Sequence, residues 1–323
     1  MSRMLVLLIG VLTATTAWSV VVVPITHANN APESVWNPAE LRIGEVDHVY
    51  RITRHEITVG QFCEFLNDGN SEHFATTQTP FVQVAEVDGT YVPAMHENHP
   101  IETSYVAATA FASWMTETTG VPWWIPSESE WVKAVHYEPA IESYWRFPNR
   151  SHIQPTASLP TLDDNSCNAS PATAGFEPVG SYPNSQTPFG LLDAAGNAHE
   201  WTSTYFEGDE YWEADTYLMC RGGHWRWLSD HGHVSYRAGT HRKQPTHTGQ
   251  GFRLCTTPVV GDLNFDGIVD YPDYKIFLTN FGTSYTDGLN HWEQGDFSGD
   301  GLIDFVDFAD YFLPEFGSSD QWQ

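Results

Sequence analysis

The sequence predicts an α+β main domain over residues 36–258 with little regular secondary structure, followed by a small all-α module over residues 260–317. In the first part, short β-prone runs alternate with turns rich in glycine, proline and tryptophan, and only two stretches have helical periodicity. In the second part, two acidic loops of the same pattern follow each other, and each leads into an apolar helix.

Composition indicates a folded, strongly acidic protein. The 323 residues are 41% hydrophobic and 14% aromatic, which is enough to build one or two cores. The net charge of -27 repels nucleic acid and attracts cations, so nucleic acid is excluded as a partner. The alternative is that the acidic residues only keep an exported protein soluble. The spacing of these residues along the sequence is what distinguishes metal ligands from solvent-exposed charges.

The first 28 residues have the pattern of a secretory signal. Arg3 precedes a long apolar run, and the small residues Thr26 and Ala28 favour cleavage near Ala28. We therefore expect an exported protein, secreted or at the cell surface, with no membrane segment after cleavage. The alternative is an uncleaved anchor over residues 5–23, a run that Thr and Ser interrupt.

Cys63, Cys167, Cys220 and Cys255 are the cysteines of the chain, and they allow up to two disulfides in three pairings. None lies in a CxxC pair, so we expect a structural or buried role for these thiols rather than metal ligation.

The acidic loops read DLNFDGIVDYPD at 262–273 and DFSGDGLIDFVD at 296–307. Oxygen-bearing groups fall at loop positions 1, 3, 5, 9 and 12 and glycine at position 6, a spacing typical of calcium loops. Without the ion the carboxylates repel one another, so we expect Ca²⁺ to order both loops. The predicted ligands are Asp262, Asn264, Asp266, the carbonyl of Ile268, Asp270 and Asp273, and then Asp296, Ser298, Asp300, the carbonyl of Leu302, Asp304 and Asp307.

A short apolar helix is predicted after each loop, and the two apolar faces are expected to pack together. Pro314 has no counterpart in the first copy, so the second helix is expected to stop or kink a turn earlier. The facing residues are Tyr274, Phe277, Leu278 and Phe281 in the first helix and Phe308, Tyr311 and Phe312 in the second.

Residues 260–317 resemble a type I dockerin, the calcium-binding module that docks onto cohesin domains. Asp at loop position 12 and the lack of a clear helix before either loop carry the resemblance. It implies a cohesin-like partner at Tyr271 with Pro272 and at Phe305 with Val306, which are bulky and apolar where many dockerins have small polar residues. The alternative is a calcium-stapled C-terminal cap.

The helical stretches of the main domain are VGQFCEFLND at 59–68 and VAATAFASWMTETTG at 106–120. Helical spacing places Phe62, Phe65 and Leu66 on one face of the first, and the second ends at Gly120.

Four phrases follow one another along the main domain: YRITRHEITVGQFCEFLND at 50–68, WIPSESEWVKAV at 124–135, PVGSYPNSQTPFGLLDAAGNAHEWT at 178–202, and RGGHW at 221–225 with GFRLC at 251–255. Together, in this order, they resemble the formylglycine-generating enzyme family, also called sulfatase-modifying factor domains. The resemblance implies a C-type-lectin-like α+β fold and a cleft for a polypeptide or glycan ligand.

Enzymes of this family oxidise a substrate cysteine to formylglycine with O₂, using copper held by two cysteines after the Gly-Gly pair. The matching segment here, residues 222–237, contains no cysteine, and the first thiolate position falls at Trp227. Soft Cu(I) needs thiolate ligands. We therefore expect no catalytic residues for this reaction and a domain that binds or scaffolds.

Histidines suggest the alternative, an oxidoreductase with altered metal ligands. His199 replaces a tryptophan of the family pattern and His224 a serine, with His231 and His233 close behind. Neutral imidazole suits Zn, Cu or Fe. No HExxH spacing supports such a site, and 15 histidines are scattered through the chain.

The family also binds a structural calcium near its GNxWEW strand. Carried over residue by residue, the ligands are Asp193, the carbonyls of Gly196 and Ala198, and Glu200. The alternative for Glu200 is a buried ion pair. Asn168 matches the first ligand of a second family site, without a matching Asp. Glu128 and Glu130 are expected to begin a helix, with Ser127 as its cap, rather than to form a catalytic pair.

Overall fold

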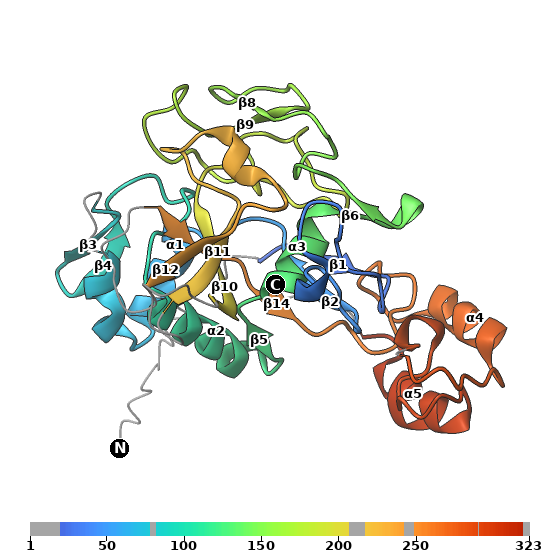
Figure 1. The fold of residues 1–323 in the computed structure, drawn as a ribbon. Helices are drawn as coiled ribbons and strands as arrows, with labels where there is room; N and C mark the ends of the chain where they lie inside the picture. Colours follow the sequence, from blue (N-terminus) through green and yellow to red (C-terminus); the bar gives the residue numbers. More distant parts are fainter. Residues whose placement is uncertain (1–19, 78–81, 207–216, 242–248, 290, 319–323) are drawn as a thin grey trace, which may run out of the picture.

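The computed structural model describes residues 20–77, 82–206, 217–241, 249–289 and 291–318. Figure 1 shows a main body that holds almost all of the strands, with the C-terminal module to one side of it. Within the described ranges, no helix has both the length and the apolar character needed to cross a bilayer.

Two four-stranded sheets form the centre of the main body in the described part of the chain. The first is antiparallel throughout; in the second, β13 runs parallel to β10. The first sheet contains, in spatial order, β1 (Val22–Ile25), β2 (Tyr50–Thr53), β14 (Cys255–Thr256) and β5 (Trp123–Trp124). The second contains β12 (Ala238–His241), β11 (Tyr217–Arg221), β10 (His199–Tyr205) and β13 (Gln250–Gly251).

Three two-stranded ribbons complete the described strands. They pair β3 (Val84–Val87) with β4 (Thr90–Pro93), β6 (Tyr137–Glu138) with β7 (Ser143–Tyr144), and β8 (Thr156–Ala157) with β9 (Ser166–Cys167). The last pair is parallel and lies in the loops at the top of Figure 1.

Strand β1 lies upstream of Ala28, where cleavage is predicted, and upstream of the predicted domain start at residue 36. It pairs with β2 from Val22 to Ile25, and the side chain of Ile25 is fully buried. Residues 1–19 of the predicted signal lie outside the described residues. Cleavage near Ala28 would therefore remove an edge strand and part of the core.

The two predicted helices of the main domain are confirmed as α1 (Val59–Asn67) and α2 (Tyr105–Thr119). Thr58 and Gln61 form a capping box at the start of α1, and Gly120 ends α2 in the left-handed conformation that glycine adopts without strain. The rings of Phe62 and Phe65 lie 5.9 and 5.4 Å from that of Phe111, which joins the two helices in one core.

In the C-terminal module, α4 (Tyr271–Asn280) follows the first loop, and a π-helical turn (Asp307–Phe312) with α5 (Leu313–Glu315) follows the second. The remaining short 3₁₀ turns of the described chain are Ala39–Leu41, Ser71–Thr77, Pro139–Ile141, Ser229–Gly232 and Trp292–Gln294. The chain is helical without a break from Phe305 to Glu315, so the predicted earlier stop is wrong. The π-helical turn directly before Pro314 is the distortion that accompanies the proline in place of a break.

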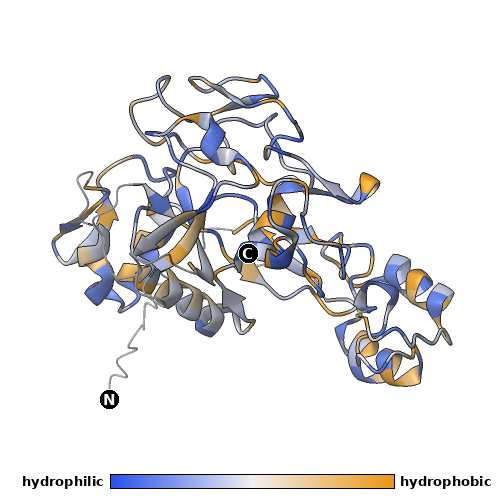
Figure 2. Cartoon of the chain, viewed as in Figure 1, coloured by the Kyte–Doolittle hydropathy of each residue, from blue (hydrophilic) through white to orange (hydrophobic). Residues whose placement is uncertain are grey.

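The two helical segments of the module pack through Phe277 and Phe312, which are fully buried with ring centroids 5.6 Å apart. Leu278, Phe281 and Tyr311 are 50%, 48% and 38% exposed, so the predicted interface is wrong for these three residues. Each segment is short and buries only one stripe against the other. Figure 2 shows the consequence, since the module's helices mix hydrophobic and hydrophilic residues.

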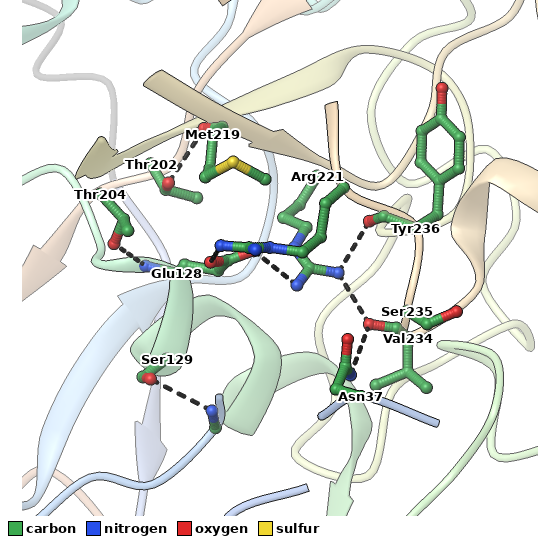
Figure 3. Close-up of polar contacts among 12 residues, drawn as sticks. Asn37, Glu128, Ser129, Thr202, Thr204, Met219, Arg221, Val234, Ser235 and Tyr236 are labelled. Carbon is green, nitrogen blue, oxygen red and sulfur yellow. Dashed lines mark hydrogen bonds and ion pairs between the residues drawn. The ribbon is translucent and has the colours of Figure 1, made fainter. Parts of the chain in front are cut away.

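Helix α3 (Glu128–His136) begins as predicted, with Ser127 and Glu130 forming a capping box. Glu128 is not a surface acid: it is buried and accepts hydrogen bonds from Arg221 and Arg237 at 2.8 Å. Figure 3 shows that Arg221 also reaches the backbone carbonyls of Val234 and Tyr236, both at 2.7 Å. Burial alone would raise the pKa of Glu128, and the two guanidinium groups hold it below its usual value.

We expect Glu128→Gln to lower the free energy of unfolding by about 3 kcal/mol or more, because it leaves buried Arg221 without its counter-charge. Glu45→Gln breaks an exposed pair with Arg42 and is expected to cost less than about 1 kcal/mol. Urea unfolding at neutral pH measures both. Equal losses from the two substitutions would contradict this account of Glu128.

Candidate functional site

The two acidic loops fold in the same way, around the aspartate at position 12. Asp273 accepts hydrogen bonds from the backbone N–H groups of Leu263, Asn264 and Asp270 at 2.8, 3.0 and 2.9 Å. In the second loop, Asp307 accepts from Ser298 at 2.8 Å and from Asp304 at 2.9 Å. Both aspartates are fully buried, so each draws its loop into a closed turn.

The aspartate at position 1 closes the other half of each loop. Asp262 accepts from the N–H of Gly267, and Asp296 from that of Gly301, both at 2.9 Å. Gly301 has a φ of +81°, and a Cβ there would lie 2.7 Å from the carbonyl oxygen of Tyr285. Only glycine fits this position.

The first loop concentrates negative charge. Burial, together with nearby Asp273 and Asp266, raises the pKa of Asp262 to about 6 against the hydrogen bond from Gly267. Its predicted donors are carboxylate, amide and carbonyl oxygens, which are the hard ligands that Ca²⁺ takes. The residues present therefore fit calcium in their chemistry.

The arrangement of these oxygens fits an ion less well than their chemistry does. Within the described ranges, no three side chains of His, Cys, Asp or Glu gather tightly enough to hold a metal ion. Several loop oxygens are occupied inside the loop instead; Asn264, for example, donates to Asp266 at 2.9 Å. Oδ1 of Asp270 has no partner in the described structure. Both ligand sets thus remain predictions.

The calcium site predicted in the main domain contains a buried ion pair. Both oxygens of Glu200 accept from Nε of Arg253 at 2.9 Å, and Trp131 donates to the same carboxylate at 2.6 Å. This arrangement matches the alternative expected for Glu200. Arg253 also donates to the carbonyl oxygen of Arg54 at 2.6 Å.

The other predicted ligands of this site lie beside that pair. One oxygen of Asp193 accepts from the N–H of Gly180 at 2.6 Å, and its Oδ1 has no partner in the described structure. Gly196 has a φ of +80°, and a Cβ there would lie 2.0 Å from the carbonyl oxygen of Asn168. Ala198 donates its N–H to Glu56 at 2.8 Å.

Glu56 is a member of this cluster that sequence patterns did not reveal. Burial and the neighbouring Asp193 raise the pKa of Glu56 well above its usual value, and burial raises that of Asp193 to about 6. Three buried acids, counting Glu200, thus lie near Arg253. The excess negative charge requires a proton or a cation, and the free oxygen of Asp193 is available to either.

We call the region around Trp227, in the segment that matches the family's copper segment, the cleft. Aromatic rings fill it. Trp227 lies among three histidines, with ring centroids 5.2 Å from His199, 4.6 Å from His224 and 4.7 Å from His231. Tyr236 stacks on His231 at 4.1 Å.

His199 is the most unusual of these groups, since it is fully buried and neither ring nitrogen has a partner among the described residues. Burial lowers the pKa of His199 well below its usual value and that of His224 to about 4, so both imidazoles are neutral at pH 7. His233 is not part of the group; its Nε2 lies 2.7 Å from Nε of Arg146.

The four cysteines are all free and buried, and none lies in this cleft. Cys63 and Cys220 belong to the core around α1 and α2, while Cys255 and Cys167 belong to two other clusters. The disulfides that the sequence allowed are absent. Burial raises the pKa of the thiols of Cys63, Cys167 and Cys220 to about 12, so they remain protonated.

Residues 19–258 match the family described as Sulfatase-modifying factor enzyme 1-like domain. The chain is 25% identical over 230 residues to hercynine oxygenase from Mycolicibacterium smegmatis, covering 60% of this chain and 50% of that protein. It is 24% identical over 229 residues to serine/threonine-protein kinase pkn1 from Chlamydia caviae, covering 64% of this chain and 33% of the relative. It therefore spans half or less of these two relatives.

Among solved structures, the fold is similar to that of CarF, with a TM-score of 0.54, 15% identity and coverage of 74% of this chain and 99% of CarF. Treponema denticola variable protein 1 has a TM-score of 0.50, 14% identity and coverage of 73% of this chain and 95% of its own. At this level of identity the likeness concerns the fold alone.

Asp273→Ala is expected to open the first loop, because it removes three hydrogen bonds from backbone N–H groups to a buried carboxylate. We expect the module's stability to fall by about 3 kcal/mol or more. Hydrogen exchange of residues 260–317 measures it, with Asp310→Ala, an exposed aspartate outside the loops, as the control. Unchanged protection in Asp273→Ala would show that this carboxylate does not hold the loop.

Proposed function

The chain belongs to the Sulfatase-modifying factor enzyme 1-like family, and from this premise we propose that it is an exported protein whose main domain binds or scaffolds rather than catalyses. A calcium-dependent, dockerin-like module would tether it through a cohesin-like partner. The observation that carries the proposal is the cleft, where Trp227 lies among histidine rings and every cysteine of the chain lies elsewhere.

The copper chemistry of formylglycine formation requires thiolates that bind Cu(I). Here the thiols are protonated and buried in apolar clusters, none of which includes Trp227. The similar proteins named as an oxygenase and a kinase are much longer than the matched segment, and their activities give no direct reason to assign either one here.

Surface chemistry at the tail supports the tethering role. Tyr271 and Phe305, at the positions where a dockerin would contact its partner, are 61% and 68% exposed. Both follow the position-9 aspartates of the loops, so calcium binding would hold them in place. Large exposed aromatic groups of this kind are typical of protein interfaces.

A second candidate function is a metal-dependent oxidoreductase that uses His199 and His224 as ligands. The unpartnered nitrogens of buried His199, with its ring 6.2 Å from that of His224, favour it. Elemental analysis of protein freed of loosely bound ions separates the two: calcium alone supports the binding role, and stoichiometric copper, iron or zinc supports the enzyme.

We expect strong chelation to unfold residues 260–317 while the main domain stays folded, because the repelling carboxylates of the loops lose their counter-ion. The apolar core of the main domain is separate from the module core built on Phe277 and Phe312. Circular dichroism and limited proteolysis, with and without calcium, provide the measurement. A tail that resists proteolysis equally in both conditions would refute calcium-dependent ordering.

The purified protein, supplied with copper and O₂, is expected to leave a CxPxR peptide unoxidised, since the cleft holds no thiol. Mass spectrometry of the peptide after aldehyde labelling gives the readout. Trp227→Cys provides a further variant, and it is also expected to be inactive because a single thiolate does not make the two-cysteine site. Aldehyde formed by the native chain would overturn the proposal that the main domain is not catalytic.

A further inference from the structure

Strand β1 and the link that follows it, residues 20–30, belong to the folded protein, although the sequence predicts cleavage near Ala28. The strand pairs with β2 along its whole length, Val22–Ile25. Ile25 is fully buried in the core around α3, while Val20 and Val22 pack against the core that holds α1 and α2. Removal of β1 would therefore open both large apolar cores of the main domain.

Loss of β1 would also change the first sheet. Strand β2 lies between β1 and β14, and all four of its residues are buried. Without β1, one side of β2 would present free backbone N–H and C=O groups at the edge of the sheet, which promotes pairing with other chains. The two strands beyond it, β14 and β5, have only two residues each. A chain without β1 would thus be less stable and more prone to aggregate.

The link after β1 contacts a buried lysine of α3. Nζ of Lys133 donates to the carbonyl of His27 at 2.9 Å, and the side chain of Lys133 has no exposed surface. Burial lowers the pKa of Lys133 to about 8, while the carboxylates of Glu293 and Asp47 favour its charged form. A cut after Ala28 would take this carbonyl away from a cation that is already poorly solvated.

The same link also binds the C-terminal module. Glu293 lies three residues before the second acidic loop, and its carboxylate accepts from the backbone N–H groups of His27 at 2.6 Å and Ala28 at 3.2 Å. Hydrogen bonds to an ionised carboxylate are stronger than those between neutral groups. A cut after Ala28 would remove both donors, and with them this contact between the module and the main domain.

Another candidate cut lies upstream of β1. The apolar run at 4–12 has the length of the apolar region of a signal, ~7 to 15 residues. The pattern of two small residues separated by one, which signals carry directly before the cut, occurs twice after this run: Thr15 with Ala17, and Ala17 with Ser19. Either cut leaves β1 complete. The family match supports this boundary, since it begins at residue 19 rather than after Ala28.

We propose that the signal is cut after Ala17 or after Ser19, so that the mature protein keeps β1 and the link through His27 and Ala28. Water hydrolyses one peptide bond; the new carboxylate leaves with the signal, and the new ammonium group begins the mature chain. The enzyme that fits is a signal peptidase that recognises small side chains before the cut. This inference rests on the export proposed above and replaces the cut expected near Ala28.

The test expresses the full chain, with its own signal and a C-terminal affinity tag, in a bacterial host that exports proteins to a periplasm. Intact-mass spectrometry of the periplasmic protein identifies its first residue, which we expect to be Trp18 or Val20. Ala17 belongs to both small-residue patterns, so we expect Ala17→Arg to leave the precursor uncut. Ala28→Arg is the matched control and is expected to give the same product as the native sequence.

A second measurement compares two chains made without a signal, one beginning at Val20 and one at Asn29. We expect the shorter chain to be insoluble or to unfold at a lower urea concentration, because it lacks Ile25 and the carbonyl that Lys133 contacts. Equal urea midpoints for the two chains would overturn the argument that β1 belongs to the mature fold.

Any other first residue in the periplasmic protein, Asn29 included, would overturn this inference and leave export intact. The same holds for an exported chain that keeps its signal in the membrane, and for normal processing of Ala17→Arg. A full-length chain found only in the cytoplasm would overturn the proposed export together with the inference. Fractionation of the cells before mass analysis distinguishes these failures.

Discussion

The buried ion pair between Glu200 and Arg253 is the contact on which the main domain depends. Glu200 lies on β10 in one sheet, and Arg253 lies in the short link between β13 and β14, which belong to different sheets. The guanidinium also donates to the backbone carbonyls of Thr53 and Arg54, at the end of β2. One fully buried cation thus joins both sheets, and removal of either partner would leave a charge without compensation.

The cleft and the acid cluster both derive from this pair. His199 directly precedes Glu200 on β10, so the two side chains point to opposite faces of the sheet. Glu56 and Asp193 lie on the other side and supply more negative charge than Arg253 neutralises. The same strand therefore presents the neutral imidazole of His199 to one environment and the carboxylate of Glu200 to another, and the two environments favour different ligands.

Sequence patterns predicted those features of the fold that depend on residues close together in the chain. The helices at α1 and α2, the capping box at Ser127 and the turn of each acidic loop depend on residues within a few positions of one another. The acid at Glu56 did not follow from any pattern, because its partners are distant in sequence. The π-helical turn before Pro314 also escaped prediction, since a proline rule gives the expected break but not the way in which packing accommodates it.

The C-terminal module contacts the main domain at Glu293, which accepts from the backbone N–H of His27 at 2.6 Å. We propose separate chemistry for the two parts: calcium in the tail, and a cleft without a redox metal. Anomalous X-ray scattering from crystals grown in calcium, copper, iron and zinc tests this most directly. We predict calcium in both loops and no metal between His199 and His224. A transition metal seated between those imidazoles, or two loops without calcium, would contradict the account.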